Sequence, residues 1–242
     1  MIIKSCPKLT KVPCLASVHH LELENCNEML LGSAANFPSL TSLVIHLFPE
    51  LTYLPEGMLI NKSVLTSLVI SSCPKLLYLP DEFIHLVSLK SLVFRRCNSL
   101  SSCPPELQSL SSLTSLEICD VQKCLLCKKK SEQLTVVHCP NLASLLADIQ
   151  HLSALKSLII LRCPELESLP YELTQIRTLQ SLEIQSCPGL RALPDWIGNI
   201  PSLQSLAILD CLNLSYLPAG LKHHKGLQHL SVQDCPKLEM TV

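Results

Sequence analysis

The chain alternates short runs of apolar and polar residues with longer segments in which an apolar residue recurs every three or four positions. In residues 179–202, Leu182 and Ile184 are separated and flanked by polar residues, which is the period-two pattern of a half-buried strand. Cys187-Pro188 then ends the strand, because proline lacks the N–H that a sheet ladder requires. A unit this short cannot bury its apolar side alone, so the pattern predicts a stack of similar units.

The same unit recurs along nearly the whole chain. Its opening leucine returns every 24 residues, apart from one gap of 42, at Leu65, Leu89, Leu113, Leu155, Leu179, Leu203 and Leu227. The position that ends the strand is mostly cysteine, and the chain places there Cys6, Cys26, Phe48, Cys73, Cys97, Val121, Cys139, Cys163, Cys187, Cys211 and Cys235. In most units a proline, usually preceded by leucine, follows seven residues later. We therefore expect about eleven repeats.

These repeats predict an α/β fold in which residues 1–242 form a single elongated, curved domain. About ten or eleven parallel strands are expected to line its concave face. Proline followed by acidic residues, as in Pro80-Asp-Glu, is a helix start, so short helices, 3-10 turns and loops should cover the convex side. The second residue of each strand should form one buried column that includes Leu68, Leu92, Leu158, Leu182, Leu206 and Leu230.

The repeat is interrupted once, at residues 119–133, where a Leu-Pro and a convex segment are missing. We expect a solvated loop that divides the array. Cys124 and Cys127 form a Cys-x-x-Cys pair beside three lysines, so an oxidation-sensitive loop and a zinc site with Cys119, His138 and Cys139 are the alternatives. We predict no metal, because a strong zinc signal has two such pairs and Cys139 belongs to the repeat column.

Composition narrows the possible functions. Charged residues are 16% and hydrophobic residues 48% of the chain, which fits a continuous leucine core. The net charge of −1 offers no basic excess for nucleic acid, and no apolar run is long enough to span a bilayer. Most of the fourteen cysteines recur at one repeat position, which predicts buried free thiols in a reducing compartment, the cytoplasm or nucleus.

No catalytic arrangement stands out. The nine histidines are scattered, no Ser/His/Asp grouping is visible, and no Gly-x-x-x-x-Gly-Lys-[Ser/Thr] loop for a nucleotide occurs. We therefore predict no enzyme activity and no cofactor in this chain.

The segment Leu179-Gln-Ser-Leu-Glu-Ile-Gln-Ser-Cys-Pro188 and the Leu-Pro of Ser168-Leu-Pro-Tyr-Glu-Leu173 resemble the leucine-rich repeat. Their Cys-Pro and Leu-Pro style is similar to the C-terminal repeats of plant intracellular nucleotide-binding leucine-rich-repeat (NLR) disease-resistance proteins. The resemblance implies a leucine-rich-repeat solenoid shaped like a horseshoe. It also implies that any nucleotide is held by a separate domain ahead of the repeats. Because neither end shows a polar capping unit, we expect the chain to be part of a larger protein.

Candidate binding residues are those that alternate with the buried strand positions. Several put apolar groups on the expected concave face, beside arginines, and such gathered apolar groups mark interaction sites. They are Val69, Val93, Arg95, Arg96, Val137, Ile159, Leu161, Arg162 and Leu209. The same columns turn acidic toward the C-terminus, with Glu117, Asp120, Glu183, Asp210 and Asp234, which predicts a charge gradient that orients a partner.

Our first hypothesis is a non-catalytic protein-recognition module of a plant innate-immune receptor. It senses a pathogen effector or host protein, or contributes to autoinhibition by contacting other domains of the receptor. The alternatives are the substrate-binding repeat arm of a ubiquitin-ligase adaptor and an extracellular receptor domain. A coiled coil and nucleotide-binding loop encoded upstream favour the first hypothesis, an F-box the second, and a signal peptide the third.

Overall fold

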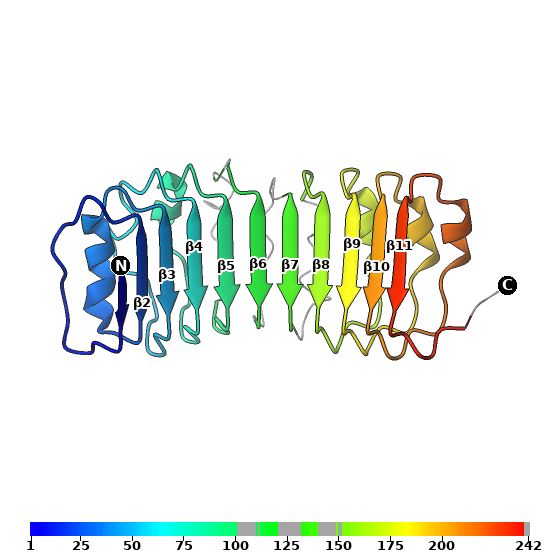
Figure 1. The fold of residues 1–242 in the computed structure, drawn as a ribbon, viewed down its shortest axis with the longest axis horizontal. Helices are drawn as coiled ribbons and strands as arrows, with labels where there is room; N and C mark the ends of the chain where they lie inside the picture. Colours follow the sequence, from blue (N-terminus) through cyan, green and yellow to red (C-terminus); the bar gives the residue numbers. More distant parts are fainter. Residues whose placement is uncertain (101–109, 111, 121–131, 140–148, 150–151, 240–242) are drawn as a thin grey trace. The chain divides into compact units, whose positions relative to one another are not determined.

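The structure, a computed structural model, describes residues 1–100, 110, 112–120, 132–139, 149 and 152–239 (Figure 1). The chain divides into two compact units, Met1–Cys127 and Lys128–Val242. The boundary falls within the segment where the repeat is interrupted. Cys124, Cys127 and the loop expected around them lie outside the described residues.

Each unit is a parallel sheet in which the strands follow one another in chain order, one strand to a repeat. The first unit holds β1 (Ile2–Lys4), β2 (His20–Glu24), β3 (Ser42–His46), β4 (Ser67–Ser71), β5 (Ser91–Arg95) and β6 (Ser115–Cys119). The second unit holds β7 (Gln133–Val137), β8 (Ser157–Leu161), β9 (Ser181–Gln185), β10 (Ser205–Leu209) and β11 (His229–Gln233). The predicted parallel arrangement is thus confirmed, with eleven strands in the part of the chain that the structure describes.

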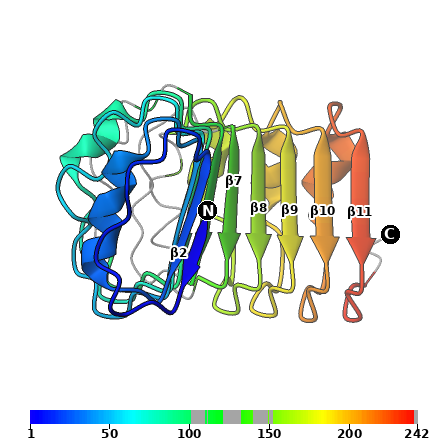
Figure 2. The same ribbon diagram turned by 60° about the vertical axis from the view of Figure 1, so that its left-hand side comes forward.

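The helices are short and lie on one side of the strands of each unit, which leaves the other face of the strands open (Figures 1 and 2). Those in the described segments are the 3-10 helices η1 (Glu28–Asn36), η2 (Asp81–His85), η5 (Tyr171–Gln175), η6 (Asp195–Asn199) and η7 (Ala219–His223). The prolines Pro80, Pro170, Pro194 and Pro218 stand at the N-cap with extended backbone angles, one residue earlier than the first helical position that the sequence predicts.

The core is built from two inward columns of each sheet. The second residues of neighbouring strands are in register, as Leu68 with Leu92 and Leu182 with Leu206, and all four are fully buried. Leu230 is the exception and was wrongly expected to be buried, because its side chain is 48% exposed. β11 pairs only with β10 among the described strands, so one side of Leu230 has no neighbouring leucine.

A left-handed turn ends every strand. The residue after each strand has φ between 48° and 57°, and these residues are Ser5, Asn25, Leu47, Ser72, Arg96, Asp120, His138, Arg162, Ser186, Asp210 and Asp234. The turn aims the N–H at the last carbonyl of the next strand, as from Ser72 to Arg95 (2.8 Å). The cysteine that follows turns inward, and its thiol donates to the carbonyl two residues earlier, as from Cys163 to Leu161 (3.4 Å).

The turn geometry explains the recurring cysteine. Cysteine is small and largely apolar, so it fits a buried position. Its thiol is a weak donor that can use the second lone pair of the nearby backbone carbonyl. Cys73, Cys97, Cys163, Cys187 and Cys211 are buried free thiols, as the sequence predicts. Within the described residues, no helix is long and apolar enough to cross a membrane.

Candidate functional site: the open face of the strands

The open face of the first unit carries a short apolar row. The middle residues of β2 to β6 are in register, and they are Glu22, Val44, Val69, Val93 and Glu117. Val44 and Val69 are half-buried. Val44 is absent from the candidates drawn from the sequence, although it occupies in Leu43-Val44-Ile45 the place that Val69 has in its own repeat. The alternation alone was sufficient to find it.

Val93 contributes less surface than expected, because only 9% of it is exposed. In the sheet it lies between Val69 and Glu117. The apolar part of this face is therefore centred on Val44 and Val69 rather than on Val69 and Val93.

The two arginines of the first unit are paired with acids of the next repeat. Arg95 places both Nε and Nη2 2.8 Å from the same carboxylate oxygen of Glu117. Arg96 lies on the turn that follows β5, and its Nε is 3.5 Å from Asp120. Both arginines are exposed, yet each is offset by a neighbouring negative charge, so this end of the face is a set of ion pairs and not a basic patch.

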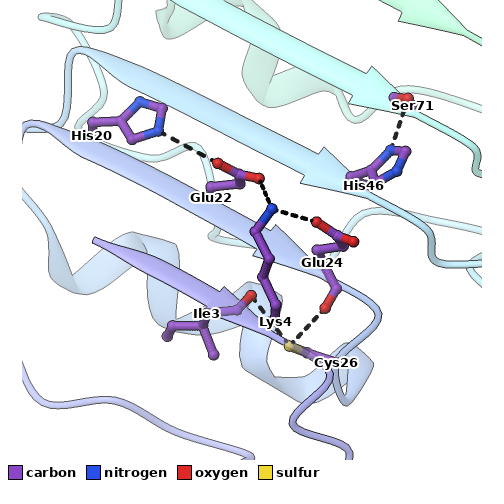
Figure 3. A network of polar contacts seen from close by, with 8 residues as sticks. All are labelled: Ile3, Lys4, His20, Glu22, Glu24, Cys26, His46 and Ser71. Atoms are coloured by element: carbon purple, nitrogen blue, oxygen red, sulfur yellow. Dashed lines mark hydrogen bonds and ion pairs between the residues drawn. The ribbon is translucent and has the colours of Figure 1, made fainter.

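A second charged cluster lies at the other end of the same face, and the sequence analysis missed it (Figure 3). Lys4 of β1 reaches over β2 and places its Nζ 2.7 Å from the carboxylates of both Glu22 and Glu24. The Nε2 of His20 is 4.0 Å from Glu22. Because acids stand at both ends of this unit, the predicted simple charge gradient does not describe it.

The cluster shifts the ionisation of its members. The hydrogen bond from Lys4 holds the pKa of Glu22 below its usual value, and hydrogen bonds to the two carboxylates raise the pKa of Lys4. On the neighbouring strand His46 shares a hydrogen bond of 2.9 Å with the Ser71 hydroxyl. Polar side chains therefore border the valine row, and they form hydrogen bonds with one another on the same face.

The open face of the second unit is more apolar. Its middle column holds Thr135, Ile159, Glu183, Ala207 and Ser231, and its last column holds Val137, Leu161, Gln185, Leu209 and Gln233. The predicted residues Val137, Ile159, Leu161 and Leu209 thus share one face, and all four are half-buried. Both Ile159 and Leu161 lie on β8. Ile159 is flanked by Thr135 and Glu183, and Leu161 by Val137 and Gln185.

The turns below these strands carry charge of both signs. Arg162 is exposed and forms no ion pair within the described part of the chain. Two repeats further on, Asp210 accepts a hydrogen bond of 2.8 Å from the Ser186 hydroxyl, and Asp234 follows in the next repeat. In this unit the charge of the turn residues therefore changes from positive to negative toward the C-terminus.

The described residues offer no group of three or more His, Cys, Asp and Glu side chains that could hold a metal ion. The proposed zinc ligands Cys124 and Cys127 lie outside those residues, so the zinc hypothesis is not tested. What the open faces do present is aliphatic surface with charged and hydrogen-bonding margins. Such surface suits contact with a protein partner.

The fold is that of the leucine-rich repeat. The chain is similar to the leucine-rich-repeat domain of the type III effector XopL, with 25% identity over 86% of this chain and 73% of that one and a TM-score of 0.59. It also resembles an internalin, InlF, from Listeria monocytogenes (17% identity, 89% and 66% covered, TM-score 0.53). Toll in the Drosophila Toll–Spatzle complex matches with 15% identity over 94% of this chain and 31% of that one, with a TM-score of 0.67.

The family match is confined to part of the second unit. The profile of the R13L1/DRL21 leucine-rich repeats matches residues 167–235. No curated protein matches the chain in sequence. Proteins of this repeat fold are typically non-catalytic scaffolds for protein interaction.

Proposed function

We propose that this chain is a protein-recognition module of a plant innate-immune receptor and that the open strand faces bind the partner. The observation that carries the proposal is the apolar surface of the second unit, formed by Val137, Ile159, Leu161 and Leu209 with Arg162 beside it. The family match to repeats related to plant resistance proteins supports the immune role.

The composition of the face suits specific binding. Protein interfaces combine an apolar centre with a polar rim, and charged margins chiefly set orientation and association rate. Ile159 and Leu161 supply the apolar centre in the second unit, and Arg162 supplies a cation that no acid of the described residues neutralises. A partner that brings an acidic group to Arg162 therefore gains an ion pair without breaking one.

The partner in this proposal is a pathogen effector, a host protein or another domain of a larger receptor. The chain contributes no cofactor, and any nucleotide is held by a different domain. The buried free thiols are stable in a reducing environment, which supports a place in the cytoplasm or nucleus.

The experiment is site-directed photo-crosslinking. A photoreactive amino acid is placed at Leu161 on the open face or, as the control, at Arg177 on the opposite side of the same unit. The proteins are then incubated with extract from infected plant tissue. We expect a discrete protein adduct from Leu161 and none of the same mass from Arg177. An adduct that forms equally from both positions, or only from Arg177, contradicts the assignment of the open face.

A further inference from the structure

A group of exposed aliphatic side chains in the first unit lies away from its open face. Ile60, Val64, Ile84 and Val87 are 42–47% exposed, and they precede β4 and β5 on the helical side of the unit. A hollow of about 360 Å³ lies among Ile60, Asn61, Ser63, Ile84, His85 and Val87. Its volume is at the small end of the range for ligand pockets, about 300–1,000 Å³, so it suits an inserted side chain better than a large cofactor.

The repeat itself does not require these aliphatic groups. Counted from the opening leucine of each repeat, Ile60 and Ile84 occupy the place that Thr174, Gly198 and Lys222 hold in the second unit. Val87 likewise corresponds to Arg177, Pro201 and Lys225. Since those repeats bury their core with polar or small residues at these positions, packing does not account for the isoleucines and Val87.

Two carboxylates stand at the same end of the two repeats that form the hollow. Glu56 and Asp81 each follow the proline of a Leu-Pro pair, and both are exposed. Neither carboxylate forms an ion pair or hydrogen bond within the described residues. Asp81 and Ile84 are three residues apart in the 3-10 helix η2, where positions i and i+3 lie one above the other. The acidic and apolar groups therefore share one side of η2.

The neighbouring Glu82, in contrast, has a carboxylate that is already hydrogen-bonded within the protein. Its carboxylate accepts hydrogen bonds from the backbone N–H groups of Gly57 and Leu59, so it fastens the two repeats together. Glu56 and Asp81 remain as negative charges that no described residue pairs with.

We propose that this hollow is a second docking site, which binds a basic amphipathic helix of a protein partner. One side of a helix presents residues about 5–6 Å apart at three- and four-residue spacing, so aliphatic residues on that side can enter the hollow between Ile60 and Ile84. Lysine or arginine residues beside them then face Glu56 and Asp81. An anionic membrane surface is a poor alternative, because the two carboxylates repel it.

The test uses the full chain and a fluorescent peptide. Isolated helices shorter than about 12–15 residues are marginal in water, so the probe has about 18 residues, with leucines on one face and lysines beside them. Its affinity is measured by anisotropy. The comparison peptides have the same composition in scrambled order, or glutamate in place of every lysine. We expect saturable binding of the basic amphipathic probe and at least tenfold weaker binding of both comparison peptides.

Variants of the protein locate the binding. Ile84→Thr with Val87→Arg copies residues that the chain already uses at Thr174 and Arg177, so the fold should be kept, as checked by circular dichroism. We expect this pair to weaken binding at least tenfold. Asp81→Asn with Glu56→Gln should weaken it about threefold or more and reduce its salt dependence, while Ile159→Ser on the open face should leave it unchanged.

Several outcomes overturn the proposal. One is equal binding of the scrambled or acidic peptide, and another is an unchanged affinity in the folded Ile84→Thr/Val87→Arg variant. If that pair does not fold, Val87→Arg alone decides the question. Binding of the protein to phosphatidylserine vesicles that the same variants abolish identifies a membrane as the occupant instead. Because Ile159→Ser tests the open face separately, failure here leaves the proposed function intact.

Discussion

At the scale of single residues, the cysteine column combines packing with chemistry. Burial raises the pKa of the Cys73 thiol to about 11 and that of the Cys97 thiol to about 12. The neighbouring Cys163 thiol and burial together raise the pKa of Cys187. Because the thiolate is the reactive form, these residues are protected both by the protein around them and by their ionisation.

Alkylation rates test this protection. At pH 8 a thiol of pKa about 11 is ionised to about one part in a thousand, so Cys73 and Cys97 should react with iodoacetamide orders of magnitude more slowly than the exposed Cys14. The rates are followed by mass mapping of the folded protein, with a urea-unfolded sample as the control in which the difference disappears. Labelling of Cys73 as fast as that of Cys14 in the folded state contradicts the buried column.

The Lys4 cluster predicts a pH dependence of stability. Contact with Lys4 lowers the pKa of Glu22 from its ordinary 4.5 in the folded state. The stabilisation is therefore complete above about pH 4.5 and is lost as the pH falls through the lower folded-state pKa. Glu22→Gln should reduce the urea midpoint at pH 7, and its deficit relative to wild type should shrink at pH 3.

The control for this measurement is Glu56→Gln, whose carboxylate contacts no cation within the described residues. It should leave the midpoint at pH 7 unchanged. A deficit of Glu22→Gln that is the same at both pH values assigns the loss to packing and not to the ion pair.

At the scale of secondary-structure elements, glycines set how closely two helices of the second unit approach. A Cβ added at Gly198 of η6 lies 2.4 Å from the carbonyl oxygen of Gly220 in η7, and one added at Gly220 lies 2.5 Å from the carbonyl oxygen of Asp195. Backbone atoms cannot yield as a side-chain tip can, so the two convex segments are in contact only because both positions lack a side chain.

Gly198→Ala should destabilise the protein by about 1–3 kcal/mol, the usual range for overpacking. Gly32→Ala is the matched control, because Gly32 also lies in a 3-10 helix, η1, and a Cβ there meets no atom within 4 Å. Gly32→Ala reduces the conformational freedom of the unfolded chain, so it should leave stability unchanged or raise it by up to about 1 kcal/mol. Urea unfolding followed by circular dichroism compares the two. Equal effects of both substitutions rule out close approach as the cause.

Features that depend on local sequence could be predicted, whereas contacts between side chains of different strands could not. The strands and their order follow from local alternation and from the 24-residue period, so Leu182 and Ile184 were sufficient to place β9. The ion pairs are different, because Lys4 reaches Glu22 and Glu24 across a strand boundary and Arg95 reaches diagonally to Glu117. Those choices depend on side-chain rotamers in the assembled sheet, which periodicity does not encode.

Burial at the margins was equally hard to predict. Lys62 is fully buried, and its ammonium group donates to the carbonyls of Ala35 and Phe37 near the end of η1. From sequence alone, a lysine in a repeat is expected at the surface. Its role in capping the carbonyls near the end of η1 is visible only once η1 has been placed. The exposed aliphatic residues Ile60 and Ile84 were missed for the opposite reason, since apolar residues between strands suggest core.

At the scale of the whole molecule, both units are built from the same type of repeat, but their surfaces differ. The first unit has a valine row between ion-paired margins and a second apolar surface among its helices. The second unit has the larger aliphatic face and Arg162, which forms no ion pair with the described residues. A recognition role for the open faces therefore predicts that the second unit supplies most of the binding energy.

The most direct measurement is a titration of the crosslinked partner, produced in recombinant form, against three variants of the full chain. The double substitution Ile159→Ser with Leu161→Ser removes two apolar contacts, each of about 1–3 kcal/mol when buried, so Kd should rise at least thirtyfold. Arg162→Glu should raise Kd about tenfold and slow association at low salt. Arg177→Ser, on the opposite side of the unit, should leave Kd unchanged. If the partner binds the first two variants as tightly as wild type while both remain folded, the open face is not the recognition surface.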